Sequence, residues 1–187
     1  MNLALQLGGL VLIGGAVGSG IASVLIATRP VVGQALGPGV AALLIASAGL
    51  LLLGVPAMYA VQAAATGALG LAAHALLVLG LLLLVIVSAT PLLYPSLGVS
   101  TIEHPLVFGL GIALVLGLLL TGVVTFQAGV LPRPAAGLVL AAMAGFFFVF
   151  FVAEFLPPVA GQAGTAIFGV LLALGFAWIG LAIWQHR

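Results

Sequence analysis

The chain has 187 residues, of which 65% are hydrophobic and 3% are charged, and its formal net charge is +1. A soluble domain needs a largely polar surface with about a quarter of its residues charged, so this composition excludes one. The chain has no basic patch, which argues against nucleic acid as a partner. It also contains no cysteine, which excludes disulfides, thiolate metal sites and cysteine nucleophiles.

Long apolar runs predict helices that cross a membrane. A crossing needs about 20 apolar residues, and these runs do not alternate as lipid-facing strands would. We expect spans at residues 5–27, 39–59, 70–92, 106–128, 135–156 and 164–184. Short turns between them, including residues 61–69, predict a single transmembrane domain: an all-α, polytopic, six-helix antiparallel bundle. The first span has no Lys/Arg-rich leader, so we expect it to be retained.

Small residues recur at helical spacing in the first and last spans. Such faces let two helix backbones approach closely, either within one chain or between chains. Besides membrane lipid, we therefore predict a protein partner or a homo-oligomer that uses these faces. The residues are Gly14 and Gly18, Ala16 and Gly20, and Gly169, Ala173 and Ala177.

One short segment occurs twice. PVVGQA at residues 30–35 returns as PVAGQA at residues 158–163, each time after an odd-numbered span. Repeated helical hairpins would produce this echo, and so would chance in a chain of such biased composition. Both interpretations stay open.

The charged residues predict an orientation. With six spans, Arg133 and Arg187 lie on the same side as both termini, and Arg29 lies opposite with both glutamates. Cytoplasmic loops carry an excess of Lys and Arg, so we expect cytoplasmic termini in a multi-pass protein of the cell membrane.

Glu154 is the acidic residue closest to a span, in a phenylalanine-rich stretch at residues 136–158. It falls about 12 Å from the bilayer centre at 1.5 Å per residue. Three roles are open: a hydrated interfacial group, a member of an ion pair, or a proton or ligand site. Arg29 and His104 are the candidate partners on the same face, and Glu103 beside His104 is expected to be a solvated loop pair.

His74 is the histidine expected inside a span. A neutral imidazole bonded to a carbonyl or hydroxyl is the simplest role, and haem ligation is the alternative. Paired haem ligation needs a second histidine at similar depth, and no metal-ligand cluster or catalytic motif occurs. We therefore predict no enzyme, no metal and no required cofactor. A lipid, quinone or carotenoid is the hydrophobic ligand that the apolar surface would suit.

Three segments carry a resemblance to a group of bacterial multi-pass membrane proteins. They are HALLVLG at residues 74–80, QAGVLPR at 127–133, and FG at 168–169 followed by GFAWIGLAIW at 175–184. Together they cover about a third of the chain. The group is uncharacterised and has no assigned activity, so the resemblance supports the six-span topology and leaves the function open.

These observations lead to two functional hypotheses. The first is a non-enzymatic accessory or scaffold subunit of a membrane complex, or a binder of a hydrophobic molecule. The alternative is a small transporter or channel that uses Glu154 with Arg29 and His104 on the same face.

Overall fold

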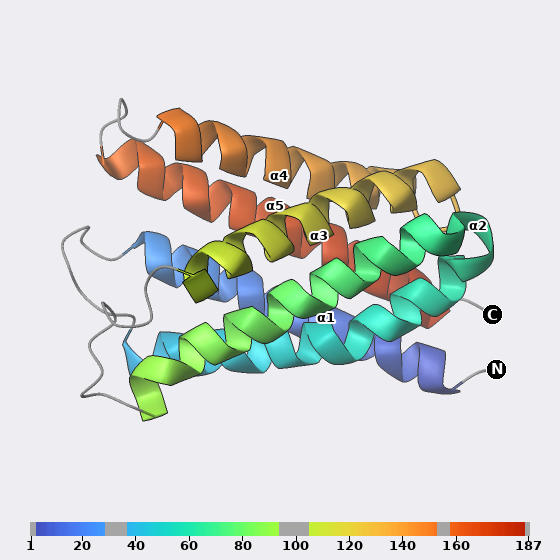
Figure 1. Ribbon diagram of the computed structural model, residues 1–187, viewed down its shortest axis with the longest axis horizontal. Helices are drawn as coiled ribbons and strands as arrows, with labels where there is room; N and C mark the ends of the chain where they lie inside the picture. Colours follow the sequence, from blue (N-terminus) through green and yellow to red (C-terminus); the bar gives the residue numbers. More distant parts are fainter. Residues whose placement is uncertain (1–2, 29–36, 94–104, 153–157, 186–187) are drawn as a thin grey trace.

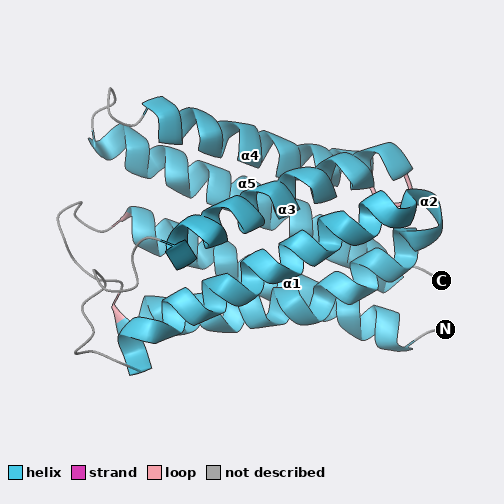
Figure 2. Ribbon diagram, in the orientation of Figure 1, coloured by secondary structure: helices cyan, strands magenta, loops and turns pink. Residues whose placement is uncertain are grey.

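The computed structural model describes residues 3–28, 37–93, 105–152 and 158–185 (Figure 1). Within these ranges the chain is helical apart from short turns and contains no strand (Figure 2), so the predicted all-α class is confirmed. The five helices are α1 (Leu3–Ala27), α2 (Pro38–Leu93), α3 (Pro105–Ala128), α4 (Arg133–Val152) and α5 (Pro158–Gln185).

Helix α2 consists of two arms that meet at Gly67. This residue has φ 55° and ψ −142°, a backbone conformation that glycine adopts far more readily than residues with a Cβ atom. The chain reverses there, and the two arms run back side by side (Figure 1). Residues 61–69, where a turn was expected, are therefore helical except at Gly67. Alanine-rich sequence before the glycine favours this continuation of the helix.

Length and composition fit an integral membrane protein. In the described part of the chain, four helical segments are long and apolar enough to cross a bilayer: Leu3–Ala27, Pro38–Thr90, Gly109–Ala128 and Ala160–Gln185. Helix α4 contributes a shorter apolar stretch, Arg133–Phe147.

The helices pack in a closed order. Helix α1 packs against α2 and α5, α2 against α3, α3 against α4, and α4 against α5. The start of α1 and the end of α5 lie at the same end of the molecule (Figure 1). Leu12 of α1, Met58 and Leu77 of α2, and Ile179 and Ile183 of α5 are fully buried between these helices.

Glycine brings backbones together at several of these contacts. A Cβ atom on Gly9 would lie 2.6 Å from the carbonyl oxygen of Gly180, and one on Gly180 would lie 2.7 Å from that of Gly9. On the other side of the molecule, a Cβ atom on Gly80 of α2 would lie 2.6 Å from Cα of Leu114 in α3. These distances leave no room for a side chain, so the glycines set how closely the helices approach.

The small-residue faces predicted for the first and last spans pack inside the chain, with Gly20 against α5 and both Gly14 and Gly18 against α2. A Cβ atom on Gly20 would lie 2.9 Å from Cβ of Ala173, and one on Gly169 would overlap the side chain of Ser23. Gly18 faces Ser47 of α2 in the same way. The chain thus uses these faces for its own packing, and their use by a partner or a second copy stays a prediction.

A tight turn joins α3 to α4. Gly129 has φ 63°, and its N–H donates to the carbonyl of Thr125 at 3.3 Å, which caps the C-terminus of α3. The guanidinium of Arg133 lies over Gly129, where a cation complements the negative end of the helix dipole.

Candidate functional site

Most of the site residues predicted from the sequence fall outside the described residues. These are Glu154, Arg29, His104 and Glu103. The ion pair and the polar face built on them therefore remain predictions. The same holds for the first copy of the repeated segment, residues 30–35, whereas the second copy, residues 158–163, forms the beginning of α5.

His74 is buried in the second arm of α2, with 4% of its surface exposed. Its Nδ1 lies 2.7 Å from the carbonyl oxygen of Gly70, so Nδ1 carries the proton and donates it. Its Nε2 lies 3.1 Å from Nε2 of Gln62, and in a neutral ring it accepts from that amide. Both ring nitrogens are therefore engaged, which argues against haem or metal ligation through this ring. The Tyr59 ring lies at a tilt against the His74 imidazole, with the two ring centroids 5.3 Å apart.

The reversal at Gly67 creates this arrangement. Gln62 and His74 lie 12 residues apart on opposite arms of α2. The hydroxyl of Thr66 donates to the carbonyl of Gln62 at 2.9 Å, and Gly70 leaves space for the Thr66 side chain. Sequence reasoning placed Gln62 in a turn and so missed it. The available signal was Gln62 itself, a polar residue in an alanine-rich segment that is separated from His74 by Gly67.

Two threonines of α3, Thr121 and Thr125, are buried as deeply as Gln62 and His74. We call these four residues the polar cluster. Thr121 and Thr125 are 1% and 0% exposed, and Gln62 is 0% exposed. The two threonine hydroxyls and the Gln62 Oε1 atom have no hydrogen-bond partner among the described residues. In this part of the chain no three His, Cys, Asp or Glu side chains group as a metal site would need.

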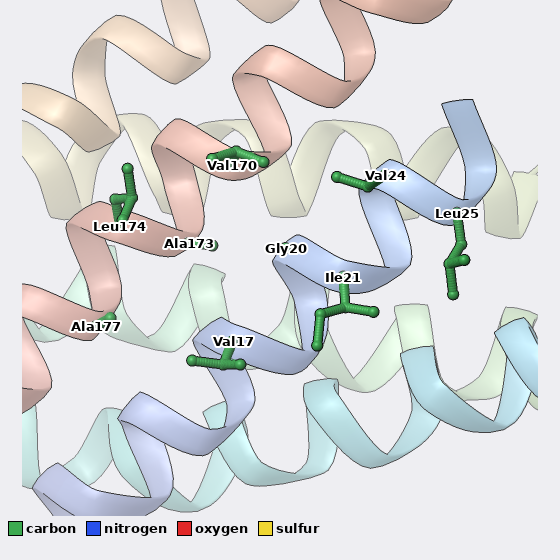
Figure 3. A pocket seen from close by; sticks show the side chains of 9 residues that line it. All are labelled: Val17, Gly20, Ile21, Val24, Leu25, Val170, Ala173, Leu174 and Ala177. Carbon is green, nitrogen blue, oxygen red and sulfur yellow. The ribbon is translucent and has the colours of Figure 1, made fainter. Parts of the chain in front are cut away.

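An apolar groove lies on the outer surface between α1 and α5 (Figure 3). Its volume is about 380 Å³ and its lining is apolar. Gly20 and Ala173 approach closely at its floor, and longer side chains such as Ile21 and Leu174 stand on either side. The remaining lining residues are Val17, Val24, Leu25, Val170 and Ala177.

A second compartment continues this groove along α5. It measures about 510 Å³ and shares Leu174 and Ala177 with the first. Its other walls come from α1, α4 and the outer face of α5: Ile13, Leu138, Trp178 and Leu181. From Val170 to Leu181 the two compartments follow α5 for about 16 Å at 1.5 Å per residue. We call the two compartments together the α1/α5 groove.

The helices and these two sites define an α-helical protein of membrane composition, with a polar cluster inside and an apolar groove outside. The chain matches no protein-family model, no curated protein and no solved structure.

Proposed function

We propose that the chain crosses the membrane six times with both termini in the cytoplasm. Each arm of α2 is longer than the about 20 residues that one crossing needs, and α4 has 20 residues. The excess of arginine on the side of the termini supports the orientation.

The absence of cysteine makes this topology testable with single-cysteine variants. Thr28→Cys, after α1, should react with a membrane-impermeant thiol reagent added outside intact cells. Val130→Cys, after α3, should react only after permeabilisation. If α2 crossed once, both positions would lie on the same side and label alike.

We further propose that the protein is a non-enzymatic binder of a hydrophobic chain, such as the tail of a lipid, quinone or carotenoid. The α1/α5 groove is the observation that carries this proposal. Its apolar lining suits a hydrocarbon or isoprenoid chain and offers nothing to a charged headgroup. Its two contiguous compartments suit an extended ligand better than a compact one.

The test is photolabelling with a diazirine-bearing polyprenyl probe in liposomes, read by mass spectrometry. Ala177 lies in the wall common to both compartments, so Ala177→Phe should fill the groove and lower labelling of α1 and α5 several-fold. Ala46→Phe makes the same change at an exposed position of α2 and should leave labelling unchanged. Equal labelling of the two variants would exclude the groove as the binding site.

The other hypotheses have weaker support. The accessory or scaffold role depends on small-residue faces, and those faces pack against other helices of the same chain. The transporter alternative depends on Glu154, Arg29 and His104, which lie outside the described residues. Binding of a hydrophobic chain is the hypothesis for which the described residues form a site.

A further inference from the structure

We infer that the polar cluster of Gln62, His74, Thr121 and Thr125 is a binding site for internal water that links α3 to the α2 hairpin. This inference concerns the interior of the molecule and is independent of the α1/α5 groove. It rests on three buried polar atoms that the described residues do not pair. It also rests on the packing register, which sets them within about one helical turn of each other, and on the hydrogen-bonding chemistry that they require.

The orientation of the Gln62 amide follows from His74. The bond from Nδ1 to the Gly70 carbonyl fixes the ring proton, so Nε2 of the neutral ring must receive an N–H from the amide. The amide oxygen of Gln62 consequently points away from the imidazole. It is fully buried and needs a donor there.

The two α3 threonines lie level with His74 and Gly70 of the α2 hairpin. A Cβ atom on Gly117 would lie 2.5 Å from the backbone nitrogen of Leu77, and Gly80 packs in the same way on Leu114. The α2 arm and α3 are therefore antiparallel, with residue numbers that rise in one helix as they fall in the other. One turn from the contact of Leu77 with Gly117, His74 is level with Thr121.

Another turn along, Thr125 is level with Gly70. Both threonines lie on the stripe of α3 that begins at Leu114 and Gly117 and faces α2 and the interior. The polar groups of the cluster thus come from three helical segments and lie within about one helical turn of each other along the helix axes.

These two hydroxyls differ from others in the same chain. Buried helical threonines and serines usually donate to a carbonyl one turn earlier. Ser23, Ser47 and Thr66 do so here, to the carbonyls of Ser19, Leu43 and Gln62. Thr121 and Thr125 do not, although each is at most 1% exposed. Their hydroxyls are thus available to a ligand.

Water is the ligand that this donor and acceptor set fits. Gln62 Oε1 only accepts, so the ligand must donate to it, whereas a threonine hydroxyl can bond to the same ligand either as donor or as acceptor. Water meets this need and makes about three bonds in such buried sites. A bare anion has no proton for the amide oxygen, and a metal cation would find no carboxylate in the cluster to balance its charge.

The test asks whether nearly isosteric substitutions of the two threonines lower or raise the stability of the protein. If the hydroxyls bind water, Thr121→Val/Thr125→Val loses these bonds and should lower the apparent Tm of the full chain in detergent by about 2–4 °C per bond lost. Thr165→Val is the matched control, because the Thr165 hydroxyl is half-buried and donates to the Gly161 carbonyl of its own helix, so its removal should lower the Tm less than removal of either buried threonine hydroxyl. A double variant as stable as the parent, or more stable, would overturn the inference, since removal of unpaired buried hydroxyls would then be favourable.

Two further measurements distinguish bound water from a dry cluster and from a bound cation. Water-selective NMR on methyl-labelled protein should give cross-peaks between water and the Thr121 and Thr125 methyl groups, and their absence counts against the site. The Tm loss should be equal in sodium chloride and choline chloride at one ionic strength. A loss seen only in sodium would assign the site to a cation and refute the water assignment.

Discussion

The contact between α1 and α5 and the contact between the α2 hairpin and α3 are built on different principles. Glycines bring the α1 and α5 backbones together at Gly9 and Gly180, and the same pair of helices leaves the apolar groove open further along. The α2 hairpin and α3 also approach through glycines, but they enclose buried polar groups.

The difference matters because lipid is as apolar as the side chains that face it. Apolar surface therefore gains little by leaving lipid for another helix, and helices associate through shape and hydrogen bonds. The α1–α5 contact depends on shape alone at Gly9 and Gly180, which makes it sensitive to a single methyl group. The α2–α3 region adds buried polar groups that must each find a hydrogen-bond partner. Its stability therefore depends on hydrogen bonding as well as on shape.

The largest effect is expected at the α1–α5 contact. In Gly180→Ala the new methyl group would lie 2.7 Å from the Gly9 carbonyl oxygen and 2.9 Å from a side-chain carbon of Ile13. The helices must separate, and we expect a loss of about 2 kcal/mol of unfolding free energy, within the range for overpacking. Unfolding in mixed micelles measures it.

Gly49→Ala in α2 is the control for this prediction, because no atom lies within 4 Å of the Cβ that it would add. The same mutation there should stabilise the helix by about 0.5–1 kcal/mol. If both variants shifted in the same direction, shape would not be what holds α1 to α5.

The next effect is expected at the turn of the α2 hairpin. Gly67 has open space around it, so Gly67→Ala meets no steric neighbour beyond its own backbone. Its φ of 55° and ψ of −142° should nevertheless cost a residue with a Cβ atom about 1–2 kcal/mol. The measurement is the same unfolding assay, with Gly49→Ala again as reference. A neutral Gly67→Ala would mean that the reversal does not need a glycine.

The helical class could be predicted from the sequence, because apolar runs of the length of a bilayer permit few other structures. The Gln62–His74 pair could not. Pro56 and the polar residues after it favoured an early end of the second span, whereas the helix continues and reverses at Gly67. Thr121 and Thr125 likewise look like ordinary helical threonines, and only the register of α3 against α2 sets them level with His74 and Gly70.

The smallest effect is expected for the coupling energy between Gln62 and His74, and it sharpens the contrast between polar and apolar contacts. Gln62→Leu and His74→Phe each leave the other residue without its partner inside the protein, at a cost of about 1–3 kcal/mol. The double variant removes both polar groups, so its loss should be smaller than the sum of the single losses. Bonds of this kind within membranes couple by about 0.6 kcal/mol on average and up to about 1.7.

A double-mutant cycle on the full chain measures this coupling directly. Gln62→Leu combined with Gly49→Ala provides the control pair, because the Cβ that Gly49→Ala adds has no atom within 4 Å through which to couple with Gln62, and the two effects should add. Additivity of Gln62→Leu with His74→Phe would show that the bond at 3.1 Å contributes nothing beyond its separate groups. The α2 hairpin would then depend on shape alone, as α1 and α5 do at Gly9 and Gly180, and the contrast between the two contacts would disappear.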